Sequence, residues 1–376
     1  VIIIAIFCYL SKFNLNFACK FNTPTMNSTL EQRIQTFVQL GQALQLFSEK
    51  REWPGYACGL TEEEFNGMND VIESAYTFNG WFTATNVRQA LSAWANELTL
   101  EKLSAWTNGV SFSSKPKTVA IICAGNIPIV GFHDILSVLI TGNKALIKLS
   151  SDDPILIPAL LKIAGKFEVD FDLNYSFSRG KLENFEAVIA TGSNSTAVHF
   201  HNYFGKYPHI IRQNRNSVAI LDGSETPEQL EKLGNDLFDY FGLGCRNVTK
   251  LYLPVDFDLD RIFNGIFSFQ SIATHNKYAN NYDYNKAVWL LNNEDLLENG
   301  FVLFKEDKNI ASPVASVFYE RYENKAALLQ HLKDHENQIQ CIVGNDFIPF
   351  GNSQCPALHD YADNVNTLDF LMSLNA

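Results

Sequence analysis

The apolar positions of the chain first follow a helical spacing. Between residues 29 and 49 they recur on one helical face, which predicts an amphipathic helix: Leu30, Ile34, Phe37, Val38, Leu44 and Phe47. The run Ser28-Thr29-Leu30-Glu31 matches a capping box, so we expect the helix to begin there. Further helices are expected at 65–76 and 85–94. This region carries no recognisable chemistry, and packing and oligomer contacts are its expected role.

From residue 118 the pattern changes to short, continuous apolar runs. We expect strands at 118–124, 144–149, 186–190 and 217–221, with helices between them at 133–140, 155–167 and 194–203. Continuous rather than alternating apolar residues are typical of strands that are buried on both faces. Strands and helices that alternate with short connections predict a parallel sheet with right-handed crossovers, and therefore the α/β class.

A second α/β unit is expected to begin near Glu225. We predict helices at 227–241, 259–269 and 325–333, and strands at 249–255, 287–291, 316–322 and 341–343. The predicted organisation is a helical N-terminal region with a first α/β domain over 26–223, a second over 224–345, and a C-terminal segment over 346–376.

The first residues are interpreted separately. Val1–Leu10 is apolar, but the lysines Lys12 and Lys20 follow it, whereas a secretory signal has its positive charge in front. A membrane helix needs about 20 apolar residues, so we expect no stable membrane insertion. Met26 stands just before the predicted capping box. Our preferred interpretation is that residues 1–25 are an over-extended gene start, and a membrane anchor is the alternative.

Composition and charge narrow the range of possible functions. The chain is 46% hydrophobic and 19% charged, which is ordinary for a folded protein. With 29 basic and 41 acidic residues its net charge is −12, which disfavours nucleic-acid binding. The seven cysteines include no C-x-x-C pair and the eight histidines have no metal-ligand spacing. We expect free thiols, no metal site and a cytoplasmic location.

Cys245 differs from the other cysteines in its surroundings. It ends the glycine-rich run Gly242-Leu243-Gly244 and precedes Arg246. Glycines let a backbone approach a ligand closely, and a guanidinium near the sulfur favours the reactive thiolate. Cys245 is therefore a candidate nucleophile, and a small buried residue at a tight helix end is the alternative. A Cys–His hydrolase also stays open, because a partner histidine need only be close in space.

The sequence motifs that would indicate nucleotide binding are weaker than those around Cys245. Neither a G-x-G-x-x-G fingerprint nor a P-loop is present. Gly192-Ser193 stands between a predicted strand and a helix, where backbone N–H groups can face a phosphate. Lys148 ends a predicted buried strand, and ligands of open α/β sheets bind at those ends.

The strand, loop and cysteine motifs, taken in their order along the chain, resemble the aldehyde-dehydrogenase superfamily. Within it they resemble the acyl-CoA reductase family that supplies fatty aldehyde in bacterial luminescence. The resemblance runs from about Thr118 to Val255, with a further match at Pro349-Phe350-Gly351. Its motifs are Asn126-Ile127-Pro128, Gly142-Asn143 leading to Lys148-Leu149-Ser150, Thr191-Gly192-Ser193, and Gly242 to Cys245.

The resemblance implies a role for each motif. Cys245 would be the nucleophile, and the Asn126 amide with the Cys245 N–H would form an oxyanion hole. NADPH or NADH would be bound by Lys148, Ser150, Thr191, Gly192 and Ser193. The C-terminal segment would return to the cofactor-binding and oligomerisation region, and the protein would be a homo-oligomer.

One departure from the superfamily pattern decides the expected direction of the reaction. Oxidising members carry Glu-Leu-Gly-Gly where this chain has Arg212-Gln213-Asn214-Arg215, and the Glu activates the water that hydrolyses the acyl-enzyme. A positioned base contributes about 10²–10⁴-fold, so hydrolysis should be slow here. Arg212, Arg215 and Arg246 either bind CoA phosphates or serve as structural ion-pair partners.

The predicted function is the NAD(P)H-dependent reduction of a long-chain acyl-CoA or acyl-protein thioester to the aldehyde through a Cys245 acyl-enzyme. A CoA-acylating or oxidative aldehyde dehydrogenase is the first alternative. A catalytically silent acyl-binding protein of the same fold is the second.

Overall fold

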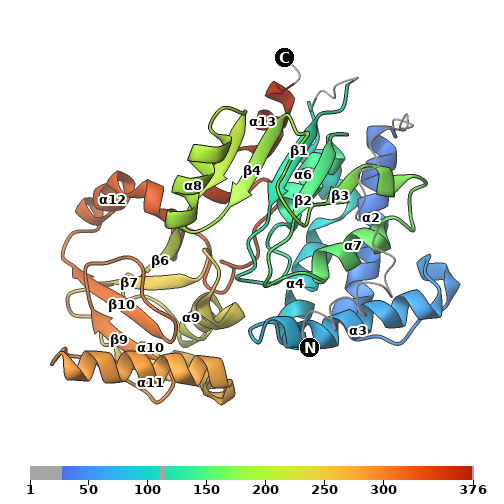
Figure 1. Cartoon of the computed structure of the whole chain (residues 1–376). Helices are drawn as coiled ribbons and strands as arrows, with labels where there is room; N and C mark the ends of the chain where they lie inside the picture. The colour runs from blue at the N-terminus through green and yellow to red at the C-terminus, as the bar shows by residue number, and fades with distance from the viewer. Residues whose placement is uncertain (1–27, 111–114, 375–376) are drawn as a thin grey trace. The chain divides into compact units, whose positions relative to one another are not determined.

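The computed structural model describes residues 28–110 and 115–374 (Figure 1). The described residues form two compact units. The first runs to Gln213 and also contains 357–361 and 365–376, and the second contains 214–356 and 362–364. The interpretation of residues 1–25 and of Met26 lies outside the described residues.

The first unit opens with helices that are capped by threonine. These are α2 (Leu30–Ser48), α3 (Glu62–Phe78), α4 (Ala84–Glu97) and α5 (Leu100–Trp106), with a short 3-10 turn η1 (Tyr56–Cys58). A threonine hydroxyl accepts from an N–H of the first turn, which that turn cannot satisfy by itself. The expected capping box of α2 was wrong by one residue, because Thr29 and Gln32 form it instead of Ser28 and Glu31.

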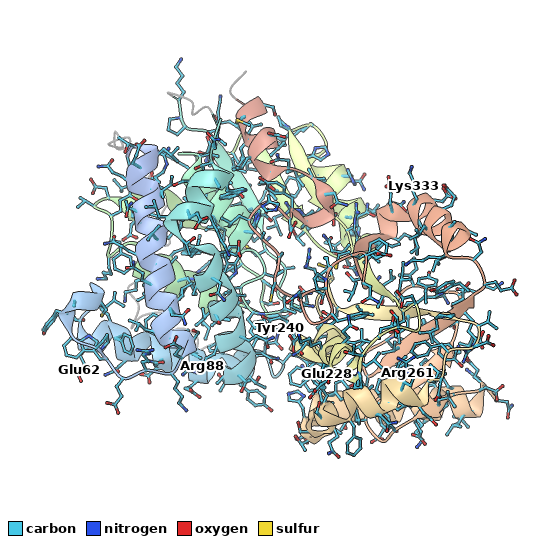
Figure 2. All side chains as sticks on the ribbon, turned by 180° about the vertical axis from the view of Figure 1, so that it is seen from behind. Glu62, Arg88, Glu228, Tyr240, Arg261 and Lys333 are labelled. Atoms are coloured by element: carbon cyan, nitrogen blue, oxygen red, sulfur yellow. The ribbon has the colours of Figure 1, made fainter. Side chains whose placement is uncertain are left out.

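Arg88 ties the first three of these helices together (Figure 2). From α4 its guanidinium donates to the carbonyl of Phe47 in α2, and to Asn69 and Glu73 in α3. The Arg88 nitrogen lies 2.9 Å from the Glu73 carboxylate. A planar guanidinium suits this role, since it presents donors in several fixed directions.

A parallel sheet follows in the first unit. Its strands are β1 (Thr118–Ile122), β2 (Lys144–Lys148), β3 (Tyr175–Phe177), β4 (Ala187–Thr191) and β5 (His209–Arg212). Its helices are α6 (Phe132–Ile140), α7 (Leu156–Ala164), α8 (Asn194–Phe204) and α13 (Thr367–Ser373), with the turn η2 (Phe171–Leu173). Figure 1 shows α8 beside β4, which it contacts, and α6 contacts β1 and β2. The short strands β3 and β5 were not predicted.

The strand order of this sheet, β3-β2-β1-β4-β5, reverses direction at β1. The chain builds outward from β1 through β2 to β3, and then returns to the other side of β1 for β4 and β5. All neighbouring strands are parallel, so their carboxyl ends share one edge. The connections after β1 and β4 therefore lead to opposite sides of the sheet, and ligands of open α/β sheets generally bind at such a reversal.

The second unit has its own sheet. Its strands are β6 (Asn216–Ile220), β7 (Val248–Pro254), β8 (Leu297–Glu298), β9 (Leu303–Glu306), β10 (Ser316–Tyr322) and β11 (Ile339–Val343), in the order β11-β6-β7-β10-β9-β8. Only β8 pairs antiparallel among these described strands. Its helices are α9 (Pro227–Phe238), α10 (Asp260–Gly265), α11 (Asn276–Leu291) and α12 (Lys325–Asp334), with turns η3 (Asp239–Gly242), η4 (Ile266–Thr274), η5 (Glu336–Gln338) and η6 (Ala362–Asn364).

Two expectations about these elements were wrong. The strand expected at 217–221 belongs to the second sheet, because β6 pairs with β7 and β11, and the first unit therefore ends at Gln213. Residues 287–291 are the end of helix α11 and not a strand. The buried residues of α11, Tyr278, Tyr282, Asn285 and Trp289, follow a helical spacing that a five-residue apolar window cannot reveal.

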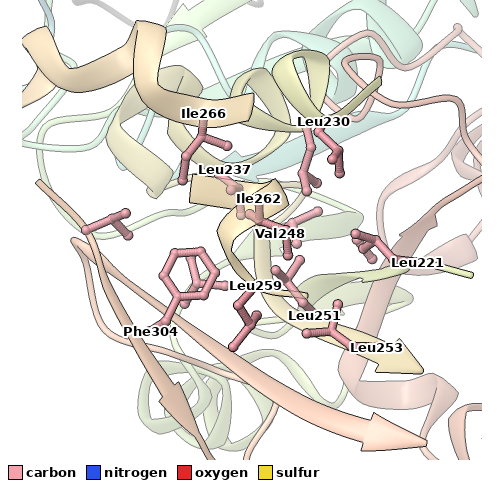
Figure 3. Close-up of a cluster of buried hydrophobic side chains, with 14 of the residues drawn as sticks. Leu221, Leu230, Leu237, Val248, Leu251, Leu253, Leu259, Ile262, Ile266 and Phe304 are labelled. Carbon is pink, nitrogen blue, oxygen red and sulfur yellow. The ribbon is translucent and has the colours of Figure 1, made fainter. Parts of the chain in front are cut away.

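The core of the second unit anchors α9 against β7. Leu230 and Leu237 of α9 point toward Leu251 and Leu253 of β7 in the same buried cluster (Figure 3). Tyr252, between these two leucines, packs into a different cluster with α12, as the alternation of side chains along a strand requires. Both ends of the segment that contains Cys245 are thus held by buried apolar contacts. In the part of the chain described, no helix has the length and apolar composition to cross a membrane.

The space around two helical glycines predicts opposite effects of alanine substitution. Gly41 of α2 packs against the end of α4, and Gly67 of α3 faces open space. A Cβ on Gly41 would lie 2.6 Å from the Leu98 carbonyl oxygen, whereas a Cβ on Gly67 meets nothing within 4 Å. We expect Gly41→Ala to lower the free energy of unfolding by about 1–3 kcal/mol through overpacking. Gly67→Ala, in the interior of α3, should raise it by about 0.5–1 kcal/mol. Chemical denaturation followed by circular dichroism measures both, and equal effects would contradict this account of the helix pair.

Candidate functional site

Cys245 lies in the second unit, directly after a turn with an unusual backbone. Tyr240, Phe241 and Gly242 have φ values of 52°, 59° and 76°, all in the left-handed region (Figure 2 labels Tyr240). For residues other than glycine this conformation costs about 1–2 kcal/mol each. Such strain persists only where the surroundings impose it, and it clusters at functional sites. Here the Phe241 ring packs on His275, with 4.2 Å between ring centroids.

The backbone of Cys245 is held by β6. The Ser217 hydroxyl donates to the Cys245 carbonyl at 3.0 Å and accepts from the Cys341 N–H at 3.2 Å. The same hydroxyl lies 3.0 Å from the Cys341 sulfur. With its one donor used on Cys245, it is left to accept from the Cys341 thiol. The structure therefore brings Cys341, Ser217 and Cys245 together, which no sequence spacing indicated.

Burial controls the ionisation of Cys245. It raises the pKa of the Cys245 thiol to about 11. The Arg246 guanidinium lowers this pKa, as the sequence predicted, but the effect of burial is larger. Cys341 and Asp363 add to the rise in the pKa of Cys245, and the carboxylate of Asp363 does so because its negative charge opposes a thiolate. In this structure Cys245 is a thiol at neutral pH.

Asn126 lies in the first unit, exposed on the loop that follows β1. Buried polar groups hold that loop on either side of it. The Asn79 amide donates to the Gly125 carbonyl at 3.3 Å, and the Asp153 carboxylate accepts from the Ile129 N–H at 3.0 Å. Burial raises the pKa of Asp153 to about 6. Asn79 and Asp153 were missed in the sequence, where nothing distinguishes them from other polar residues beside a helix.

The residues expected to bind the nucleotide stand at the carboxyl edge of the first sheet. Lys148 ends β2, and its ammonium donates to the Gly180 carbonyl at 3.4 Å. Thr191 ends β4, and Ser193 caps α8, where its hydroxyl accepts from the Thr196 N–H at 3.2 Å. Gly192 stands between them, and Ser150 follows β2. This edge therefore presents a cation, hydroxyl groups and a helix N-terminus near the reversal between β1 and β4.

The three arginines differ in their surroundings. Arg212 is only 4% exposed, forms an ion pair with Asp134 of α6 and donates to the Thr367 hydroxyl at 2.9 Å. Arg215 lies 3.2 Å from the Asp363 carboxylate, and Arg246 donates to the Ser353 carbonyl. Of the two alternatives, the structural ion pair describes Arg212 and Arg215. Arg246 is half-buried and without an ion pair among the described residues.

The predicted site residues divide between the units. Asn126, the residues expected at the nucleotide and Arg212 belong to the first unit, and Cys245, Arg215 and Arg246 belong to the second. Within the described ranges, no group of three or more His, Cys, Asp or Glu side chains is arranged to hold a metal ion.

Comparison with solved structures shows which fold the chain has. An NAD-dependent aldehyde dehydrogenase from Sinorhizobium meliloti superposes with a TM-score of 0.61 at 10% identity, covering 84% of this chain and 70% of that chain. A Mycobacterium tuberculosis aldehyde dehydrogenase, complexed with NAD+, gives 0.59 at 13%, covering 84% and 73%. An E. coli NADP dependent enzyme gives 0.58 at 13%, covering 83% and 74%. The chain has the α/β fold of the aldehyde dehydrogenases, as predicted.

Sequence comparison shows which proteins of this fold the chain resembles. Residues 102–200 match the family described as acyl-CoA reductase (LuxC). The chain is 24% identical over 229 residues to the long-chain acyl-protein thioester reductase of Aliivibrio fischeri, a match that covers 54% of this chain. The chain spans about half (47%) of that relative. The chain has the aldehyde-dehydrogenase fold and is similar in sequence to the acyl-CoA reductases, which is the resemblance that the sequence predicted.

The buried ion pair of Arg212 predicts a non-additive effect on stability. Arg212→Leu should lower the free energy of unfolding by about 3–5 kcal/mol, because it leaves the Asp134 carboxylate buried without its partner charge. The double variant Arg212→Leu/Asp134→Leu should lose less than the single variant. Lys181→Ala is the control, since its pair with Glu183 is exposed and should contribute nothing measurable. A double variant less stable than Arg212→Leu, by chemical denaturation, would contradict the prediction.

The raised pKa of Cys245 predicts how its alkylation depends on pH. Only the thiolate reacts, so the rate with iodoacetamide should rise about tenfold per pH unit and show no plateau below pH 10. Arg246→Gln should slow the reaction at each pH, because it removes a charge that favours the thiolate. Mass spectrometry of the Cys245 peptide measures the rate, with the exposed Cys355 as the internal reference. A plateau below pH 9 would rule out burial as the dominant influence.

Proposed function

We propose that this protein reduces an acyl thioester to the aldehyde, with NAD(P)H as reductant and Cys245 as the acyl carrier. The observation that carries the proposal is the position of Cys245. It follows a strained left-handed turn in an aldehyde-dehydrogenase fold, in a chain that also matches the acyl-CoA reductases.

Cys245 performs the covalent step. Its thiolate attacks the thioester carbonyl carbon, a C–S bond to Cys245 forms, and the carrier leaves as a thiolate when the old C–S bond breaks. The Asn126 amide and the Cys245 N–H donate to the oxyanion of the tetrahedral state. One such donor is worth about 10²–10³ in kcat. Because burial raises the pKa of Cys245, its proton must leave before the attack, and Arg246 favours that loss.

The carboxyl edge of the first sheet fits a dinucleotide. The Lys148 ammonium, the Ser150, Thr191 and Ser193 hydroxyls and the N–H groups at the start of α8 are donors of the kind that nucleotide phosphates and ribose accept. Gly192 lies close against α8, since a Cβ there would be 3.0 Å from the Phe200 ring and 3.1 Å from the Thr196 side chain. A bound nicotinamide would supply the hydride. The acyl carbon on Cys245 would accept it, and the C–S bond to Cys245 would then break to give the aldehyde and the Cys245 thiolate.

Arg212 explains why the acyl group would survive until it is reduced. It occupies the position of the superfamily's water-activating glutamate, and its guanidinium is engaged with Asp134. No carboxylate base is present at that position, so water attack on the acyl-enzyme lacks assistance of about 10²–10⁴-fold.

The substrate class is a thioester with a thiol leaving group. The curated relative is named for acyl-protein thioesters and the matching family for acyl-CoA. Both are attacked in the same way, since the bond that breaks is the same. We take a long acyl chain as the first substrate to test, and NADPH before NADH.

The test measures the loss of nicotinamide absorbance and the appearance of aldehyde when NADPH and a long-chain acyl-CoA are supplied. Cys245→Ala should abolish both, and Asn126→Ala should lower kcat by about 10²-fold. Cys355→Ala is the control and should retain wild-type activity, because Cys355 is an exposed cysteine outside the proposed machinery.

Other outcomes separate the alternatives. Activity that persists in Cys245→Ala would overturn the proposal. Turnover only from aldehyde and CoA to acyl-CoA would identify a CoA-acylating dehydrogenase. An acyl group that stays on Cys245 without turnover would identify an acyl-binding protein of this fold.

A further inference from the structure

Asn247 is a fully buried amide two residues after Cys245, and it contacts both sides of the turn that leads to Cys245. Its Oδ1 accepts from the Gly244 N–H at 2.8 Å. Its Nδ2 donates to the Asp236 carbonyl at 3.1 Å and to the Asp239 carbonyl at 2.9 Å. The side chain is 0% exposed, so these bonds replace hydration that it lost on folding.

The two carbonyls belong to the end of α9. The last carbonyls of a helix have no N–H partner within the helix. Here the chain cannot supply the next helical N–H groups, because Tyr240 and Phe241 turn into the left-handed region. The Asn247 amide provides donors in their place, and it therefore fastens the strained turn to the start of β7.

The backbone of Asn247 fixes the peptide between Gly244 and Cys245. Its N–H donates to the Gly244 carbonyl at 3.0 Å, and its carbonyl accepts from the Ser217 N–H at 3.3 Å. A trans peptide is planar, with its C=O and N–H pointing in opposite directions. Because the Gly244 carbonyl is turned toward Asn247, the Cys245 N–H is turned away from it.

Close packing leaves this peptide little freedom. A Cβ on Gly244 would lie 3.0 Å from the Asn247 Oδ1 and 3.4 Å from the Gln354 Oε1, tighter than most real contacts. On the far side of Cys245, the Ser217 hydroxyl holds the Cys245 carbonyl. The polar backbone groups on both sides of the Cys245 N–H are thus bonded.

We propose that Asn247 is a positioning residue, which fixes the direction of the Cys245 N–H and the place of its thiol. The inference rests on the proposed function, in which that N–H donates to the oxyanion. Asn247 touches neither the substrate nor the nucleotide in this scheme, and it acts through the Gly244–Cys245 peptide.

Two variants test this role. Asn247→Asp keeps the size and the acceptor for Gly244 but turns a carboxylate oxygen toward the Asp236 and Asp239 carbonyls. Asn247→Ser shortens the side chain. Asn285→Ala is the matched control, because Asn285 is another buried asparagine of the same unit, whose amide donates to the Val314 carbonyl. All are assayed at a temperature where the circular-dichroism spectrum is that of the wild type.

We expect both Asn247 variants to lower kcat by at least about tenfold with little change in the KM for NADPH, since a displacement of 1 Å can cost about 10²-fold. Alkylation of Cys245 relative to Cys355 should become faster, because a loosened turn further exposes the partly buried thiol of Cys245. Asn285→Ala should change neither. Because all variants are assayed where they keep the wild-type spectrum, slower turnover with faster alkylation in the Asn247 variants alone indicates misplacement of Cys245 and not a general loss of structure.

Three results would overturn the inference: wild-type kcat and alkylation in both Asn247 variants, the same changes in Asn285→Ala, or failure of both variants to fold while Asn285→Ala folds. The last would make Asn247 a determinant of stability alone. Alkylation needs no turnover. Suppose that the wild-type protein reduces no thioester while Cys245 still becomes more reactive in the Asn247 variants. That result would contradict the proposed function and leave the positioning role of Asn247 standing.

Discussion

The turn between α9 and β7 is the constraint on which the candidate site depends. α9 is held against β7 by Leu230, Leu237 and Leu251, so the connecting chain must reverse direction within a few residues. It does so by placing Tyr240 and Phe241 in the left-handed region, and the last carbonyls of α9 accept hydrogen bonds from Asn247. Buried apolar packing thus offsets a strained backbone. The consequence is that Cys245 stands at a fixed place, with its N–H directed away from the turn.

Burial affects the two ionisable groups that matter most, Arg212 and Cys245, in different ways. For Arg212 it is tolerable because Asp134 lies beside it and Thr367 accepts another bond. For Cys245 it raises the pKa, because Arg246 compensates only partly. The Arg212 guanidinium is therefore a fixed part of the first unit, and the Cys245 thiol is protonated at rest. Loss of its proton becomes part of the chemistry that we propose.

Much of the fold followed from sequence pattern. The buried strands β1, β2 and β4 and the helices α2, α3 and α12 lie where apolar periodicity placed them. The errors occurred where the local pattern is ambiguous. The end of α11 resembles a strand because five apolar residues have no readable period, and β3 and β5 are short edge strands with weak signals. The sheet to which β6 belongs depends on pairing with distant segments, which no local window contains.

The sequence by itself determined the chemistry that is available: a cysteine in a glycine-rich turn, an Asn-x-Pro loop, a lysine at a strand end, and an arginine where the resemblance to the aldehyde dehydrogenases implies a glutamate. These are properties of residue types and spacings, and a chain carries them before it folds. Only the tertiary structure decided what those groups do at rest. Arg212 pairs with Asp134, and Ser217 and Cys341 lie beside Cys245, although these residues are far apart in the chain. The burial of Cys245 and its link to Asn247 depend on a turn that no motif encodes. Desolvation and hydrogen-bond geometry arise only when such segments meet.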